Sequence, residues 1–210
     1  MPASSRAHGR VSALAITAAL SLLLAACGGG DKEPVAGDSD TGSKSAQAFG
    51  EVSVTGPDLT EYSSDGADAT VGSVAPTLTM EGPTGDKGVI GGAAQPTLVV
   101  FLAHWCPHCQ AEVPVIVKAF KDGRVPDIRL VAVATSTNPQ AQNYPPDSWL
   151  DREDWPGEIL LDDKDFTAGR AFGLASFPYL VALDAAGKVT GRALGDTTVS
   201  QIEALAATAV

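Results

Sequence analysis

The sequence predicts an α/β domain built on a central mixed β-sheet flanked by helices, and two observations carry this prediction. A continuous apolar strand from Thr97 to Ala103 is followed by a helical pattern and then by a second apolar strand from Ile128 to Ala134. A strand, helix and strand at this spacing form a crossover unit whose two strands are parallel. Shorter strands joined by tight turns flank this unit, and such hairpins add antiparallel neighbours.

The first predicted elements lie around the crossover unit. Thr77 to Met80 and Asp86 to Ile90 form a hairpin around a turn rich in glycine and proline. The strand at 97–103 is apolar at successive positions, as expected where both faces of a sheet are covered. The helix that follows has an apolar stripe and contains Pro114, which is expected to bend it.

Shorter elements complete the domain after the second parallel strand. They are a helix at 147–154, a strand at 158–161, a helix at 165–172 capped by Gly173, strands at 179–183 and 188–194, and a closing amphipathic helix at 197–207.

A pair of cysteines separated by two residues, Cys106 and Cys109, lies where the first parallel strand meets its helix. The first turn of a helix has unpaired N–H groups and the positive end of the helix dipole, so a thiolate there is stabilised and becomes the nucleophile. Cys106 occupies that place, and Pro107 suits the first helical position. Cys109 is one turn further, close enough to form a redox-active disulfide with Cys106.

Cysteine pairs of this kind have two other uses. A disulfide across so small a loop constrains little chain, which makes a purely structural role a poor use of it. A zinc site needs four ligands, and the sequence has no second cysteine pair; His104 and His108 are near, but the strand and helix would scatter the four side chains. We expect neither a metal nor a cofactor.

The charge of the chain bears on its partners. The 210 residues include 25 acidic and 14 basic side chains, which gives a formal net charge of −11. Nucleic-acid binding proteins present a basic face, so this balance argues against a nucleic-acid partner.

The first 26 residues are predicted to be a signal peptide. Arg6 and Arg10 precede an apolar stretch from Val11 to Leu24, which is too short to span a bilayer comfortably. The stretch ends in Leu24-Ala25-Ala26-Cys27, which resembles the lipobox of bacterial lipoproteins. That resemblance implies that Cys27 is lipidated and anchors the mature protein at the extracytoplasmic face of the cell membrane. An ordinary secretory cleavage and an uncleaved anchor remain open.

Residues 27–68 are predicted to be the lipidated N-terminus and a flexible linker, and residues 69–210 the folded domain. The segment is rich in Gly, Ser, Thr, Asp and Ala and has few large apolar side chains. A flexible chain of about forty residues reaches roughly 35 Å, which would lift the domain off the membrane. The alternative is a packed extension around four residues, Phe49, Val52, Val54 and Tyr62.

The domain resembles the thioredoxin fold, in particular its exported TlpA/ResA-like branch of thiol–disulfide oxidoreductases. Three pieces of sequence carry the resemblance: Trp105-Cys106-Pro107-His108-Cys109, the Cys-x-x-Glu-x-Pro pattern of Cys109 to Pro114, and Gly173 to Pro178 followed by a strand and the turn Asp184 to Gly187. It implies that Cys106 attacks a partner disulfide and that Cys109 resolves the mixed disulfide. It also implies that Pro178, which follows Phe177, is cis and faces the cysteines. We expect Trp105 to pack beside them.

The chain departs from the family pattern at two places. Many thioredoxins have a buried aspartate where this chain has Val100, so Glu112, one turn beyond Cys109, is the candidate to assist that thiol. An exposed helix acid is the alternative for Glu112. The dipeptide Pro107-His108 is that of DsbA-type oxidases. His108 can donate a hydrogen bond to the Cys106 thiolate and so make the disulfide more oxidising, whereas we expect His104 to be a surface residue at the rim of the site.

These observations predict a membrane-anchored oxidoreductase outside the cytoplasm that exchanges disulfides with exported proteins, as an oxidant. Its partners would be exported protein thiols or disulfides and a membrane or extracytoplasmic redox partner. The alternatives are a reductant for one client such as apocytochrome c, a peroxide-reducing protein and a metal-binding lipoprotein. The peroxidase pattern Pro-x-x-x-Thr-x-x-Cys would need proline and threonine where this chain has Val99 and Ala103.

Overall fold

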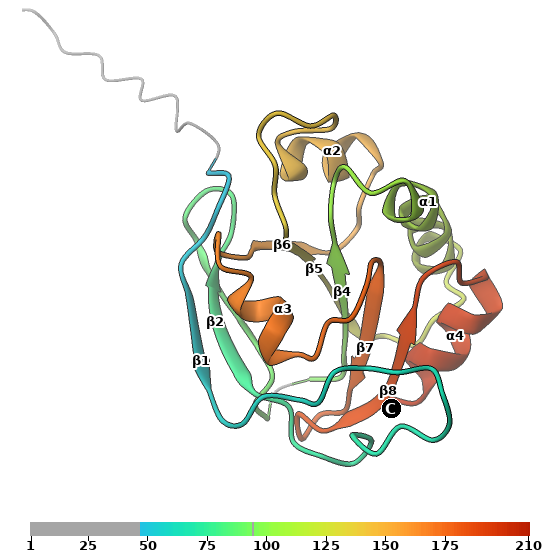
Figure 1. The fold of residues 1–210 in the computed structure, drawn as a ribbon. Helices are drawn as coiled ribbons and strands as arrows, with labels where there is room; N and C mark the ends of the chain where they lie inside the picture. The colour runs from blue at the N-terminus through green and yellow to red at the C-terminus, as the bar shows by residue number, and fades with distance from the viewer. Residues whose placement is uncertain (1–46, 94) are drawn as a thin grey trace, which may run out of the picture. The chain divides into compact units, whose positions relative to one another are not determined.

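An eight-stranded mixed β-sheet organises the part of the chain that the computed structural model describes, residues 47–93 and 95–210 (Figure 1). The strand order is β1-β2-β6-β5-β4-β7-β8, with β3 paired to β2. The strands are β1 (Val52–Thr55), β2 (Thr77–Glu81), β3 (Lys87–Ile90), β4 (Thr97–Leu102), β5 (Arg129–Ala134), β6 (Glu158–Leu161), β7 (Tyr179–Leu183) and β8 (Val189–Leu194). The helices are α1 (Pro107–Lys121), α2 (Pro146–Arg152), α3 (Thr167–Ala171) and α4 (Val199–Ala207).

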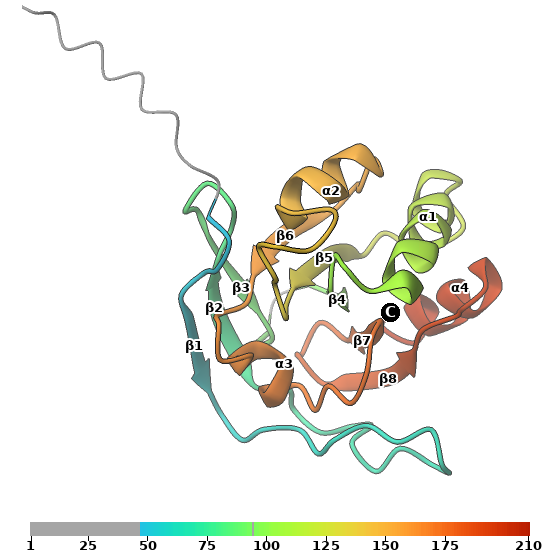
Figure 2. The ribbon, with the colours of Figure 1, turned by 45° about the horizontal axis from the view of Figure 1, so that its top comes forward.

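The central strand β4 is parallel to β5 and antiparallel to β7, and all six of its residues are buried. Its side chains alternate between two apolar clusters. Leu98 and Val100 face the cluster that includes residues of α1, α2 and α4, and Val99 and Phe101 face the one that includes α3. This explains the unbroken apolar run, because each face of β4 needs its own apolar side chains. Figure 2 shows α1 and α4 together on one side of the sheet and α3 on the other.

Most predicted elements are present, with ends that differ by a few residues. The hairpin of β2 and β3, the parallel pair of β4 and β5, the hairpin of β7 and β8, and the closing helix α4 are confirmed. The helix α1 continues through Pro114 to Lys121. None of the helices in the described residues is long and apolar enough to cross a membrane.

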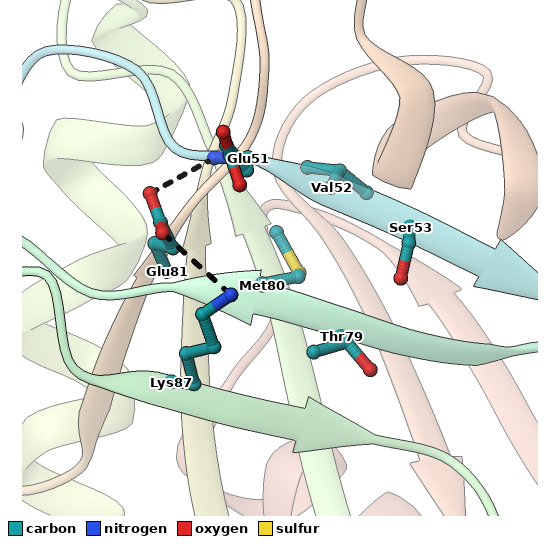
Figure 3. Close-up of a pocket in the computed structure, with 7 residues that line it drawn as sticks. All are labelled: Glu51, Val52, Ser53, Thr79, Met80, Glu81 and Lys87. Atoms are coloured by element: carbon teal, nitrogen blue, oxygen red, sulfur yellow. Dashed lines mark hydrogen bonds and ion pairs between the residues drawn. The ribbon is translucent and has the colours of Figure 1, made fainter.

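The prediction that the linker extends to residue 68 is wrong for the part that the structure describes. Residues 52–55 form β1, which pairs antiparallel with β2, so that Val52 lies opposite Met80. Figure 3 shows the start of this strand, where the Glu51 N–H donates to a Glu81 carboxylate oxygen at 3.3 Å and Lys87 lies 4.0 Å from the other oxygen. The packed extension that the sequence left open is therefore present around Val52, Val54 and Tyr62, whereas Phe49 is exposed.

Residues 56–75, here called the strap, continue from β1 across the α3 side of the sheet to the outer edge of β8 (Figures 1 and 2). The Leu59 N–H donates to the Ala171 carbonyl at 2.8 Å, and the Tyr62 N–H donates to the Gly173 carbonyl at 2.9 Å. Further on, Gly72 pairs with Val189 of β8.

Arg192 of β8 holds the strap through a buried guanidinium, whose side chain is only 2% exposed. It donates to both carboxylate oxygens of Asp68, to the Thr60 carbonyl and to the Thr70 hydroxyl. The polar composition of the strap predicted a flexible linker. The strap is nevertheless packed, because its polar groups are bound to one buried arginine of the sheet. Residues 1–26, Cys27 and the linker up to residue 46 lie outside the described residues.

Candidate active site

Cys106 and Cys109 lie where the strand-to-helix junction was predicted to place them. Cys106 is the N-cap of α1 and Pro107 is its first residue. Both cysteines are free thiols; Cys106 is 8% exposed, whereas Cys109 is fully buried and its sulfur accepts a hydrogen bond from the Ala103 N–H at 3.4 Å. A partner can therefore reach Cys106 first, and Cys109 lies behind it.

Burial raises the pKa of the Cys109 thiol, an effect that the Ala103 N–H opposes. The negative charges of Cys106 and Glu112, when ionised, raise it further. Cys109 consequently remains protonated in the dithiol form, and its proton has to leave before the disulfide closes. Glu112 lies three residues beyond Cys109 on α1, so the two side chains project from the same face of that helix.

Glu112 is buried, only 2% exposed, so the exposed alternative is wrong. Its carboxylate accepts hydrogen bonds from the Thr197 N–H at 3.0 Å and from the Thr197 hydroxyl. Burial raises the pKa of Glu112, the two bonds from Thr197 lower it, and the charge of Asp196 raises it. A buried carboxyl whose pKa is raised by burial is a candidate to exchange a proton with Cys109. Val100 lies in the apolar cluster that contains both cysteines, and its side chain supplies no ionisable group there.

The Phe177–Pro178 peptide bond is cis, as the resemblance implies. Phe101 of β4 lies opposite Tyr179 of β7, so Pro178 lies at the end of the sheet where β4 leads to the cysteines. The ring of Phe177 meets that of Trp105 edge to face at 6.3 Å. Trp105 packs against the cluster that contains both cysteines, as predicted, and its indole N–H donates to the Ser136 carbonyl at 2.7 Å.

The loop between β8 and α4 passes close to Pro178. A Cβ at Gly195 would lie 2.2 Å from Cδ of Pro178, and the Gly195 N–H donates to the Pro178 carbonyl at 2.8 Å. Only glycine permits this approach. A groove of about 300 Å³ opens here, and it is called the active-site groove below; its lining residues are His108, Ser176, Phe177, Leu194, Gly195 and Asp196.

His108 lies at the surface and turns toward Asp196, whose Oδ1 is 3.1 Å from the His108 Nδ1. Their side chains are 65% and 71% exposed. Among the described residues, Asp196 is the hydrogen-bond partner of this ring, so a bond from His108 to the Cys106 thiolate stays a prediction. Asp196 and Thr197 were not among the predicted site residues, because nothing local in the sequence marks them.

The prediction that His104 is a surface residue is wrong, because it is only 1% exposed. Its Nδ1 donates to the Gln142 carbonyl at 2.8 Å, and its Nε2 accepts from the Asn138 N–H at 3.1 Å. The Gln110 side chain in turn donates to the His104 carbonyl at 2.9 Å. Burial lowers the pKa of His104. His104 thus fastens the segment before Cys106 to the loop between β5 and α2.

Within the described residues, no group of three or more His, Cys, Asp and Glu side chains is arranged to hold a metal ion. The chemistry available at this site comes from two thiols, one buried carboxyl and the surface pair of His108 and Asp196.

Comparisons with known proteins agree with this fold. The Redoxin family matches residues 70–206. A thiol:disulfide interchange protein of the thioredoxin family from Chlorobium tepidum superposes with a TM-score of 0.53 at 20% identity, over 68% of this chain and 99% of that one. StoA from Bacillus subtilis gives 0.52 at 20% identity, over 61% and 95%. A secreted disulfide oxidoreductase from Mycobacterium tuberculosis gives 0.50 at 20% identity, over 61% and 93%. The comparison with curated proteins finds no match. The predicted thioredoxin-like fold is confirmed.

Proposed function

The chain is a thioredoxin-like oxidoreductase of the Redoxin family, and on that premise we propose that it donates disulfides to exported proteins from a lipid anchor on the outer face of the cell membrane. The observation that carries the redox part is the arrangement of the thiols: Cys106, which is 8% exposed, is the N-cap of α1, and Cys109 is fully buried one turn further along the helix. An inert structural pair would not need one accessible sulfur next to a cis proline.

The donating reaction starts from the Cys106–Cys109 disulfide. A client thiolate attacks the Cys106 sulfur, the bond between the two protein sulfurs breaks, and Cys109 leaves and takes up a proton. A second client thiolate then attacks the client sulfur of the mixed disulfide. The client gains a disulfide, Cys106 leaves as a thiolate, and two electrons have passed to the protein, which a membrane or extracytoplasmic redox partner later removes.

Glu112 supplies the proton that Cys109 takes up. Burial raises the pKa of this carboxyl, and Glu112 lies on the same face of α1 as Cys109, three residues further along the helix. In the reverse direction, when the protein is oxidised again, the same carboxylate accepts the proton. Pro178 has no N–H and, through its cis bond, shapes the surface against which the client backbone lies beside Cys106.

Donation rather than removal of disulfides is supported by what stabilises the reduced state. The N-terminus of α1 favours a Cys106 thiolate, and His108 lies one residue beyond Pro107, where it can turn toward that sulfur. A more stable reduced form makes the disulfide a stronger oxidant. The reverse activity, reduction of one client such as apocytochrome c, is the other outcome of the test below.

Export and anchoring rest on the N-terminal sequence. Arg6, Arg10 and the apolar stretch to Leu24 are typical of a signal peptide, and Cys27 occupies the place of the lipidated cysteine. The similarity to a secreted disulfide oxidoreductase supports the same compartment. Mass analysis of the protein from its native membrane should find a diacylated Cys27 at the N-terminus; an unmodified N-terminus elsewhere would contradict the anchor.

The function is tested with a reduced, unfolded polypeptide that has two cysteines. The oxidised protein in stoichiometric amount should convert it to the disulfide form, and the Cys106→Ser and Cys109→Ser variants should not. If the reduced protein instead removes the substrate disulfide and the oxidised protein forms none, the direction is that of a reductant. Failure in both directions would contradict the redox function.

A further inference from the structure

The outer edge of β8 carries backbone groups without partners among the described residues. The Gly195 N–H donates to the Pro178 carbonyl, and β7 and β8 are antiparallel with Leu180 opposite Ala193. Hydrogen-bonded and non-hydrogen-bonded residue pairs alternate along such a ladder. The backbone of Ala193 therefore bonds β7, whereas the N–H and C=O groups of Arg192 and Leu194 point away from β7. The strap pairs with β8 only at its start, near residues 188 and 189.

These outward groups are accessible to a partner. Arg192 is 8% exposed as a residue although its side chain is only 2% exposed, so its exposed surface belongs mainly to the main chain. Leu194 is half-buried. An exposed strand edge of this kind is a template for pairing with another extended chain.

A groove of about 490 Å³ runs along this edge, here called the β8-edge groove. Tyr62 and Ser64 of the strap line one wall, and Gln201, Ala204 and Leu205 of α4 line the other. The small side chain of Ala193 lies between the walls and leaves room above the strand.

The β8-edge groove is continuous with the active-site groove, because Leu194, Gly195 and Asp196 line both. His108, two residues beyond Cys106, lines the active-site groove, so a polypeptide whose cysteine reaches Cys106 can continue into that groove. Its next residues are then beside the β8 edge, since an extended chain advances about 3.3 Å per residue.

We propose that the segment flanking the reacting cysteine of a client adds as a short strand to the outer edge of β8, pairing with the backbone of Arg192 and Leu194. This inference rests on the proposed function and names the substrate class of that site: exported polypeptides that are still unfolded around the cysteine. A folded client has its backbone groups paired already and cannot present such a strand. Backbone pairing also accepts many sequences, which suits a donor of disulfides to many clients.

The test uses mixed disulfides on Cys106 of the Cys109→Ser protein. One carries a thirteen-residue probe peptide with a central cysteine flanked by alternating Thr and Ala, and the other carries glutathione. Amide hydrogen exchange at Arg192 and Leu194 should slow by about tenfold with the peptide and remain unchanged with glutathione. Equal exchange in the two adducts would overturn the proposal, as would protection already present in the free protein through pairing of two copies.

Two variants on α4 provide a matched pair. Ala204→Trp fills the β8-edge groove, whereas Ala207→Trp places the same side chain at another exposed position of α4 outside it. The first should slow reaction of the oxidised protein with the reduced probe peptide several-fold, and the second should not. Both should react normally with reduced glutathione. If Ala204→Trp leaves the peptide rate unchanged, the edge is not used; if the wild type fails with both thiols, the proposed function itself is wrong.

Discussion

Replacing Asp196 with asparagine should make the protein a stronger oxidant. The Asp196 carboxylate is 3.1 Å from the His108 ring, and we expect it to compete with the Cys106 thiolate for that ring. Asp196 has a φ of 59°, a left-handed conformation that asparagine adopts readily, so the substitution removes the charge and keeps the loop. The freed imidazole can then turn toward the thiolate of the reduced form.

The size of the change follows from what His108 gives up to reach the thiolate. An exposed pair such as His108 and Asp196 contributes about 0.2–1 kcal/mol, less than the about 1.5–3 kcal/mol of a charge-assisted hydrogen bond to the thiolate. In the reduced wild type the ring therefore reaches the thiolate only by losing that pair, whereas the variant has no pair to lose. The substitution thus favours the reduced state by the energy of the pair, about 0.2–1 kcal/mol. At about 30 mV for each 1.4 kcal/mol, the potential should rise by about 4–20 mV.

The assay equilibrates each variant with glutathione buffers and measures the fraction of dithiol by alkylation and mass. Asp127→Asn is the control, because Asp127 precedes β5 at the opposite end of the sheet from the cysteines and is equally exposed to solvent. In a His108→Asn background the Asp196→Asn effect should shrink. A potential that falls, or that rises as much without His108, would refute the competition between Asp196 and the thiolate.

Three further substitutions test the surroundings of the thiols and the strap. Glu112→Gln should slow oxidation of the dithiol about 100-fold, because Cys109 loses its proton acceptor, while attack by Cys106 on a small disulfide keeps its rate; equal slowing of both steps in stopped-flow would contradict this role. His104→Phe removes two hydrogen bonds, to the Gln142 carbonyl and from the Asn138 N–H, and at about 0.5–1.5 kcal/mol for each bond it should cost about 1–3 kcal/mol in free energy of unfolding. Because the pKa of His104 is lowered from 6.5 in the folded state, the unfolded state binds the proton first. The free energy of unfolding of the wild type should therefore fall as pH drops below 6.5. Denaturant titrations should find a much weaker fall in His104→Phe. The bond from Arg192 holds the pKa of Asp68 at about 2 instead of 3.8. The ion pair thus stabilises the protein fully above that ordinary value and fades as pH falls toward 2. Asp68→Asn should cost about 2 kcal/mol at neutral pH and little in strong acid; an equal loss at both would show that charge is not the cause.

The sequence predicted the features that depend on contacts between residues close together in the chain. The apolar run of β4, the turn of β2 and β3, and the cysteines at the start of α1 each depend on residues within a few positions of one another. The cis bond before Pro178 and the burial of Glu112 were foreseen from family resemblance or left open, because both depend on contacts with distant strands and loops.

The features that the sequence concealed are made by long-range polar contacts. Arg192 bonds Asp68 across 124 positions, and that bond turns a segment of linker-like composition into a packed strap. His104 looked like a rim residue because it precedes an accessible cysteine, yet the loop that contains Gln142 folds over it. Asp196 meets His108 only because β8 and α4 close the domain beside the active site.

The assignment of Cys106 as nucleophile and Cys109 as resolving thiol is tested most directly by trapping. The reduced Cys109→Ser and Cys106→Ser proteins are exposed to exported proteins bearing disulfides, and covalent adducts are separated without reductant. Cys109→Ser should accumulate mixed disulfides through Cys106, whereas Cys106→Ser should form almost none, since its remaining sulfur is fully buried. Equal trapping by the two variants, or trapping through Cys109 alone, would contradict the assignment.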